Sequence, residues 1–231
     1  MSMVEYFVQL DHQLLLWING FHTPFLDGIV PIFTHAATWI PMYVALFWLV
    51  IKSNQTVTQI ATIVACAGLC VLLTGTLDDM FVKPMVARLR PTHNPTIGIL
   101  VNTVDGYRGG LYGFFSAHAA NTFSIAVFFC LLVRSRLMSC MLVGWSLLNC
   151  YTRLYLGVHY PFDILVGLLW GGCMGWLIYV LYVRSGICPP LNKRFVSSQF
   201  TDTGYRLSDV RVVITVFTFT CFYAMYRALI S

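Results

Sequence analysis

The sequence TRLYLGVHYPFD, residues 152–163, places an arginine, a histidine and an aspartate between two long apolar runs. These runs, residues 137–158 and 161–183, are each about as long as a membrane-spanning helix and are almost continuous. Proline is favoured in the first turn of a helix, so Pro161 predicts the start of the second one. The stretch is therefore predicted to join two spanning helices, and its ionisable side chains need an explanation from the rest of the chain.

The composition indicates an integral membrane protein. The 231 residues are 58% hydrophobic and only 10% charged, and their mean hydropathy is +0.75. A soluble domain carries about 25% charged residues. Residues 1–19 contain no basic segment of the kind that begins a cleavable signal peptide. The net charge of +5 is modest and its lysines and arginines are scattered, so no nucleic-acid partner is predicted.

Six apolar segments are long enough to cross a bilayer as helices, which takes about 20 residues. They are residues 29–51, 57–77, 111–133, 137–158, 161–183 and 210–229. The N-terminal residues 3–21 mix apolar side chains such as Phe7 and Trp17 with Glu5 and Asp11, which is typical of an interfacial amphipathic helix. The predicted fold is all-α: one polytopic membrane domain over residues 1–231, with six transmembrane helices and an N-terminal interfacial helix.

The basic residues predict which face lies in the cytoplasm, because cytoplasmic loops are enriched in lysine and arginine. One face carries eight of them: Lys52, Arg134, Arg136, Arg184, Lys193, Arg194, Arg206 and Arg211. The other carries six: Lys83, Arg88, Arg90, Arg108, Arg153 and Arg227. Lys83, Arg90 and Arg153 are candidate functional residues, and excluding these three leaves eight basic residues against three. The first face is therefore predicted to be cytoplasmic, with both termini on the other side.

Three polar stretches fall on that second face. KPMVARLRP begins at Lys83, and its Arg90 lies seven residues later, on the same side if the stretch is helical. FSAHAAN, residues 115–121, begins the third predicted span and contains Ser116 and His118. The junction of residues 152–163 is the third stretch.

Together these stretches supply three cations, two histidines, a serine and one carboxylate, which is the composition of a site for a phosphate-like anion. Arginine presents a planar fork that suits phosphate oxygens, and lysine adds a point charge. Asp163 follows His159 by four residues, so its carboxylate can accept a hydrogen bond from one ring nitrogen and leave the other unprotonated and free to attack phosphorus. The arrangement predicts phosphoryl chemistry, which depends on charge neutralisation and an in-line nucleophile.

The same residues resemble the type-2 phosphatidic acid phosphatase superfamily, a family of six-span membrane lipid phosphatases. The match consists of Lys83 with Arg90-Pro91, then Ser116 with His118, then Arg153, His159 and Asp163, within a motif core of residues 78–183. Three positions depart from the family pattern. Phe115 and Ala117 stand where proline and glycine are usual on either side of the serine, and Thr152 stands where the third motif usually begins with serine.

The resemblance implies a role for each matched residue. His159 would attack phosphorus and form a phosphohistidine, with Asp163 orienting its ring, and His118 would act as general acid and then general base. The remaining matched residues would hold the phosphoryl oxygens: Lys83, Arg90, Ser116 and Arg153. No metal or other cofactor is implied, because these cations supply the charge.

The function implied is a metal-independent lipid phosphate or diphosphate phosphatase at the periplasmic face of a bacterial inner membrane. Undecaprenyl diphosphate, a lipid A phosphate and phosphatidylglycerol phosphate are all candidate substrates. The short loop of residues 92–110 leaves no room for a large recognition domain, so the lipid chains are expected to enter sideways from the bilayer. The oligomeric state is left open.

Two alternatives use the same features. A lipid phosphotransferase would pass the phosphoryl group from His159 to a lipid acceptor instead of water. A six-span anion transporter would need charges in mid-span or broken helices, whereas the charges here gather at one face. Arg88 and Arg108 match no motif position and are predicted to contact head groups or solvent, and His93 is predicted to lie in a turn.

Overall fold

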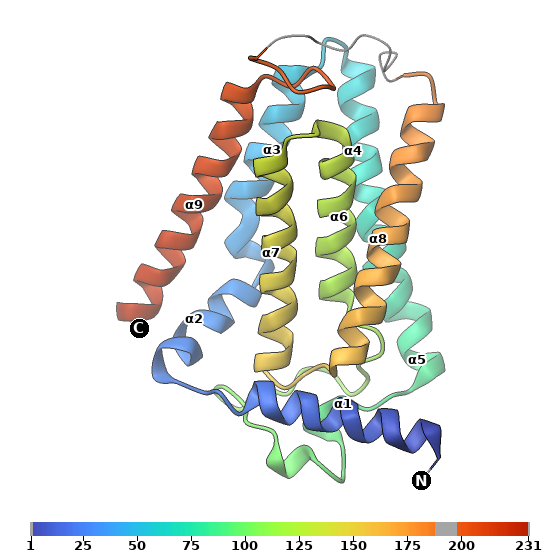
Figure 1. Cartoon of the computed structure of the whole chain (residues 1–231), viewed down its shortest axis with the longest axis vertical. Helices are drawn as coiled ribbons and strands as arrows, with labels where there is room; N and C mark the ends of the chain where they lie inside the picture. The colour runs from blue at the N-terminus through green and yellow to red at the C-terminus, as the bar shows by residue number, and fades with distance from the viewer. Residues whose placement is uncertain (1, 188–197, 231) are drawn as a thin grey trace.

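The long helices run side by side and carry the candidate residues to one end of the molecule. Figure 1 shows the computed structural model, which describes residues 2–187 and 198–230. Helices form the described part of the chain, and its only β-pairings are two isolated bridges. The elements are α1 (Met3–Asn19), α2 (Pro24–Thr34), α3 (Ile40–Ser53), α4 (Val57–Val71), α5 (Lys83–Val86), α6 (Ala117–Val133), α7 (Arg136–Tyr155), α8 (Pro161–Arg184) and α9 (Leu207–Ile230). The predicted all-α membrane fold is confirmed at this level.

Four helical segments of the described chain are long and apolar enough to cross a membrane. They are Ala36–Ser53, Val57–Val86, Pro161–Arg184 and Leu207–Ile230. The second runs from α4 to α5 through two π-helical turns, Leu72–Thr76 and Asp78–Val82. α6 has only 17 residues and α7 has 20, and both pack among the longer helices. The predicted count of six spans stays a prediction.

The first predicted span is not one helix. α2 ends at Thr34, a short 3-10 turn follows at Ala36–Trp39, and α3 begins at Ile40. His35 has an extended backbone with ψ of 123°, and its ring accepts a hydrogen bond from the Ala37 amide. The prediction of a continuous span over residues 29–51 was therefore wrong, because a local side-chain cap at His35 replaces the helical hydrogen bonds.

The third predicted span starts later than expected. Residues 111–116 were assigned to it, but α6 begins only at Ala117, with Ser116 as its N-cap. Tyr112 instead pairs with Leu89 in an isolated antiparallel bridge, and its neighbours bond the same segment. This backbone pairing outcompetes a further helical turn and brings the loop to the end of the bundle.

The closest helix pair is α6 against α8, and small residues make that closeness possible. Gly167, Gly171 and Gly175 recur every fourth residue along α8. A Cβ atom added at Gly171 would lie 2.9 Å from the Ala120 Cα atom of α6, and one at Gly175 would lie 2.5 Å from the Ser124 carbonyl oxygen. Such small-residue stripes let membrane helices approach until their backbones touch.

Helix α1 crosses beneath the bundle at the end where the candidate residues gather (Figure 1). Asp11, Leu15 and Asn19 are buried, whereas apolar residues such as Val4 and Trp17 are exposed. The predicted helix is present, and Asp11, one of its polar residues, lies on the buried side, where its carboxylate bonds to Arg88 and the Phe162 amide. The location of α1 at a membrane interface stays a prediction.

Six basic residues outside the motifs lie at the opposite end of the bundle. They occur where α3 ends, between α6 and α7, where α8 ends and where α9 begins: Lys52, Arg134, Arg136, Arg184, Arg206 and Arg211. Lys193 and Arg194, which were counted with them, lie outside the described residues. Both ends of the chain lie at the end where α1 is found (Figure 1), so the charge asymmetry coincides with the long axis of the bundle.

The glycine contacts generate a stability prediction. Gly171→Ala should destabilise the protein by about 1–3 kcal/mol, the usual cost of overpacking, because the new methyl group would press on the backbone of α6. Gly68→Ala is the matched control, since a Cβ atom there has no neighbour within 4 Å. Thermal unfolding of the two detergent-purified variants should give a lower midpoint for Gly171→Ala alone. Equal midpoints would contradict close packing of α6 and α8.

Candidate active site

The segment that follows α5 is extended. Ala87 adopts the left-handed conformation, with φ of 50°, and ends the helix. The next residues then bridge to the loop before α6: the Arg90 amide donates to the Leu111 carbonyl at 3.0 Å, and the Gly113 amide donates to the Arg88 carbonyl at 2.9 Å. Lys83 and Arg90 therefore do not share a helical face, and that prediction was wrong. Backbone pairing, not helical spacing, sets the position of Arg90.

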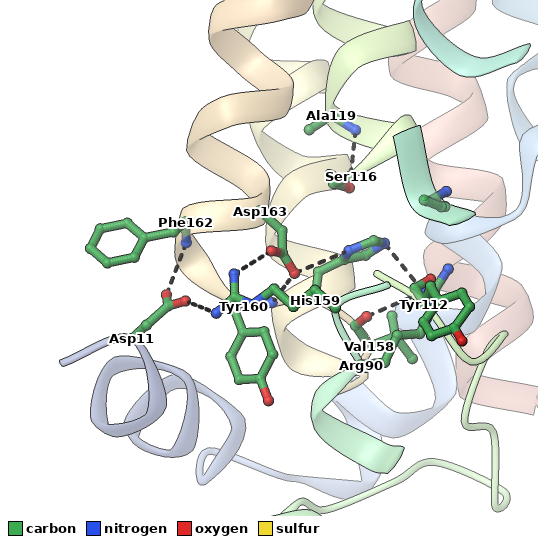
Figure 2. A network of polar contacts seen from close by, with 12 residues as sticks. Asp11, Arg90, Tyr112, Ser116, Ala119, Val158, His159, Tyr160, Phe162 and Asp163 are labelled. Atoms are coloured by element: carbon green, nitrogen blue, oxygen red, sulfur yellow. Dashed lines mark hydrogen bonds and ion pairs between the residues drawn. The ribbon is translucent and has the colours of Figure 1, made fainter. Parts of the chain in front are cut away.

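Arg90 is buried against the nucleophile candidate. Its Nη1 atom lies 3.2 Å from His159 Nε2 and 3.2 Å from the Val158 carbonyl oxygen, and its Nε donates to the Tyr112 carbonyl at 3.1 Å. Figure 2 shows the His159 ring between Asp163 on one side and Arg90 on the other. The motif Lys-x6-Arg and the junction motif thus meet in space, as the sequence predicted.

His159 is 1% exposed and lies in the short connection between α7 and α8. Its Nδ1 atom lies 3.7 Å from Asp163 Oδ2, slightly beyond hydrogen-bond range. Burial, together with the nearby charges of Arg90, Arg153 and Lys83, lowers the pKa of His159 well below 6.5. The imidazole is therefore neutral at neutral pH, which is the state in which a ring nitrogen is nucleophilic.

Asp163 is fully buried in the first turn of α8. Its Oδ2 atom accepts the Tyr160 amide at 3.0 Å, and its Oδ1 atom pairs with Arg88 Nη1 at 2.5 Å. Its backbone carbonyl accepts the Ser116 amide at 3.1 Å, which joins the start of α8 to the start of α6. One residue thus caps a helix, holds the adjoining helix and faces the His159 ring.

Ser116 and His118 lie at the N-terminus of α6. The Ser116 hydroxyl is buried and accepts the Ala119 amide at 3.4 Å, as an N-cap does. His118 occupies the first turn and is partly exposed. The N-terminus of a helix carries partial positive charge and unpaired amides, which favour a bound anion. The serine therefore has a structural role as cap in addition to any contact with a ligand.

Arg153, at the end of α7, is only 3% exposed. Its Nη1 donates to the Thr34 hydroxyl at 2.7 Å, and its Nη2 donates to the Tyr107 hydroxyl at 3.4 Å. Among the described residues, no carboxylate lies within ion-pair distance of Arg153 or Arg90. Burial and repulsion by the nearby Arg153 lower the pKa of Arg90. The same repulsion between the two guanidinium groups favours an anion between them.

Lys83 differs from the two arginines because it is already paired. It contacts Asp78 Oδ2 at 3.0 Å and also Asp79, four residues before it on the helix. The spacing of four residues between Asp79 and Lys83 is the one at which oppositely charged side chains meet on a helix. Lys83 is buried and contributes charge to the surroundings of His159.

Sequence reasoning missed two members of the site. Arg88, expected at head groups or in solvent, instead pairs with both Asp163 and Asp11, at 2.5 and 2.6 Å. Two features of the sequence could have indicated this pairing. Arg88 lies between Lys83 and Arg90 of the first motif, and Asp11 is the single aspartate among residues 3–21. His93 lies in a 3-10 turn at Pro91–His93, as predicted.

Comparison with known proteins gives a consistent assignment. Residues 63–187 match the family model described as the PAP2 superfamily. The lipid A 4′-phosphatase of Bacteroides thetaiotaomicron is 42% identical over 78% of this chain and 80% of its own length. The lipid A 4′-phosphatase of Porphyromonas gingivalis is 34% identical over 94% of this chain and 93% of its own.

Two solved structures share the fold. The LpxE protein of Aquifex aeolicus has a TM-score of 0.54 at 24% identity, over 72% of this chain and 92% of that one. A PAP2-type phosphatidylglycerolphosphate phosphatase from Bacillus subtilis has a TM-score of 0.59 at 18% identity, over 82% of this chain and 89% of that one. At these identities the likeness concerns the fold alone.

The Arg153 guanidinium, which has no carboxylate partner among the described residues, generates a binding prediction. Arg153→Lys should weaken binding of orthovanadate, a phosphate analogue, by about 10- to 100-fold, the effect of one lost charged hydrogen bond. The matched control is Arg211→Lys, at the opposite end of the bundle, which should bind vanadate normally. Calorimetric titration of both purified variants measures the effect. Unchanged affinity in Arg153→Lys would remove Arg153 from the anion site.

Proposed function

This chain belongs to the PAP2 superfamily and is a membrane phosphatase, and from that premise we propose that it removes the 4′-phosphate of lipid A through a phosphohistidine intermediate. The observation that carries the mechanism is the placement of His159, with Nε2 facing Arg90 and Nδ1 facing Asp163. A neutral histidine oriented in this way presents a ring nitrogen to an anion held by buried guanidinium groups.

The substrate proposal rests on the two relatives named lipid A 4′-phosphatase, each of which matches this chain over most of both lengths. A lipid A 1-phosphatase of Rhizobium etli is 29% identical over only 51% of this chain. These similarities favour lipid A over undecaprenyl diphosphate and phosphatidylglycerol phosphate. The difference between the curated relatives favours the 4′ position over the 1 position.

In the first step, His159 Nε2 attacks phosphorus while the bond from phosphorus to the sugar oxygen breaks. The proton on Nδ1 faces Asp163, whose carboxylate stabilises the positive charge that develops on the ring. His118, which is protonated when the dianionic phosphate is bound beside it, gives its proton to the departing sugar oxygen. The products of this step are the dephosphorylated lipid and phosphohistidine.

In the second step, His118, now neutral, takes a proton from water, and the resulting hydroxide attacks phosphorus. The bond from phosphorus to Nε2 breaks, which releases inorganic phosphate and restores His159. Arg90, Arg153 and the N-terminus of α6 stabilise the equatorial oxygens in both steps. Because these groups supply the positive charge, the reaction needs no divalent cation.

The membrane arrangement is part of the proposal. Six spans would place the site end of the bundle, with both termini, in the periplasm, and the basic end in the cytoplasm. A lipid in the outer leaflet of the inner membrane could then reach His159 without moving its phosphate through hydrocarbon, which would be energetically costly. The domain limits of residues 1–231 and lateral entry of the lipid chains belong to the same proposal.

The function is tested by phosphate release from purified protein in EDTA. The panel is lipid A, lipid A lacking the 4′-phosphate, phosphatidylglycerol phosphate and undecaprenyl diphosphate. We expect release from intact lipid A alone, and no release with His159→Ala, because the nucleophile is gone. Rapid acid-free quenching of the wild-type enzyme should trap ³²P on a histidine.

Two results would contradict this proposal. Equal activity on lipid A lacking the 4′-phosphate would shift the site of cleavage to the 1 position. Activity that disappears in EDTA and returns with Mg²⁺ would exclude the metal-free mechanism. His159→Ala should keep the wild-type unfolding midpoint within a few degrees, which separates a lost nucleophile from a lost fold.

Sidedness is tested by cysteine labelling in whole cells, with the eight native cysteines replaced. Ile99 lies in the loop at the site end and is 93% exposed, and Gln55 lies in the exposed turn between α3 and α4 at the other end. Ile99→Cys should react with an impermeant maleimide in intact cells. Gln55→Cys should react only after the membrane is permeabilised. The reverse pattern would place the site in the cytoplasm.

A further inference from the structure

The mechanism leaves one buried charge network unexplained. Arg88 reaches Asp163 with one guanidinium nitrogen and Asp11 with the other, at 2.5 and 2.6 Å. Both carboxylates are fully buried, whereas the arginine side chain is 26% exposed. Neither Arg88 nor Asp11 matches a motif position, and their side chains make polar contacts with Asp163, Phe162 and each other.

Asp11 also holds the start of α8. Its Oδ1 atom accepts the Phe162 amide at 2.9 Å, so α1 occupies an amide in the first turn of the helix that carries Asp163 (Figure 2). The adjacent Tyr160 amide is taken by Asp163 itself. The two aspartates thus cap one helix end together, and Arg88 neutralises both.

The Tyr160 ring is a third partner of the Arg88 guanidinium, after the two carboxylates. Arg88 Cζ lies 4.1 Å from the centre of the ring, in a cation–π contact, and His12 of α1 stacks on the same ring at 5.3 Å. The guanidinium is therefore held by two carboxylates and one aromatic face. Such a multiply held group has little freedom to swing toward a ligand.

We propose that Arg88 and Asp11 are positioning residues that hold the Asp163 carboxylate toward His159, so that helix α1 forms part of the catalytic apparatus. The inference deepens the proposed function and rests on it. The two carboxylate oxygens of Asp163 have three partners. Arg88 binds Oδ1, so Oδ2 accepts the Tyr160 amide and faces the His159 ring. Without Arg88, a fully buried carboxylate would lose its cation and would rotate or take up a proton.

Asp11 acts one step further away. It balances the charge of Arg88 and fixes where the guanidinium sits between the two carboxylates. Loss of the Asp11 charge lets Arg88 pair with Asp163 alone, which weakens the carboxylate as a partner for a positively charged His159. Displacement of α1 would have the same effect, because Asp11 moves with the helix. The expected defect therefore concerns the rate of phosphoryl transfer, not lipid binding.

The test measures steady-state kcat and KM on lipid A for four variants: Arg88→Gln, Arg88→Lys, Asp11→Asn and Asp163→Asn. Arg88→Gln should lower kcat by about 10- to 100-fold, as loss of an orienting group behind a reactive side chain usually does, with KM within about twofold. Arg88→Lys should recover part of that loss. Asp11→Asn keeps the acceptor for the Phe162 amide and should still lower kcat, by a smaller factor.

The decisive comparison is Arg88→Gln in the Asp163→Asn background, where it should cost little further, because both residues act through one carboxylate. Glu5→Gln is the matched control, a carboxylate on the same helix that caps α1 without reaching the network, and it should keep the wild-type kcat. A full additive loss in the double variant, or a raised KM, would assign Arg88 to the substrate and overturn the inference. If the wild-type protein releases no phosphate, the proposed function itself fails.

Discussion

The Asp163 carboxylate is the constraint on which the site depends. It is fully buried, yet it accepts the Tyr160 amide at the start of α8, pairs with Arg88 and faces the His159 ring. Its backbone carbonyl binds Ser116, the cap of α6. Four segments that are far apart in the sequence meet at this residue. They are α6, α8, the extended segment that contains Arg88, and α1, whose Asp11 pairs with Arg88. A buried charge with this many partners is stable only when all of them are in place, so the fold and the site form together.

The site also concentrates positive charge that no carboxylate among the described residues neutralises. Arg90 and Arg153 are buried beside each other without a carboxylate partner, while Lys83 has two. In the proposed mechanism, this asymmetry leaves Arg90 and Arg153 available to the phosphoryl oxygens. An anion that binds only the folded state would stabilise it, because it relieves the repulsion between these two guanidinium groups.

The sequence was sufficient for the membrane class and for the gathering of His159, Asp163, Arg90 and Arg153 at one end of the bundle, because fixed spacings at helix ends constrain these positions. It was insufficient wherever a side chain or a backbone bridge overrides helical periodicity. His35 breaks the first apolar run, and the Leu89–Tyr112 bridge removes Arg90 from the helix of Lys83. Arg88 and Asp11 were missed because they lie 77 residues apart and neither carries a motif signal. Roles of the matched residues came from family resemblance, not from spacing alone.

The stripe of glycines on α8 has a consequence for the spacing of the two site histidines in this chain. Backbone contact between α6 and α8 works as a rigid spacer, since one helix begins beside His118 and the other beside His159. The separation of His118 and His159 is therefore set by backbone atoms that cannot be moved by exchanging one side chain for another. A change of lipid preference would then have to arise away from this helix pair, at exposed positions such as Ile99 and on the lipid-facing helices. Such a division would let the lipid preference of this chain change while the distance between the two histidines stays the same.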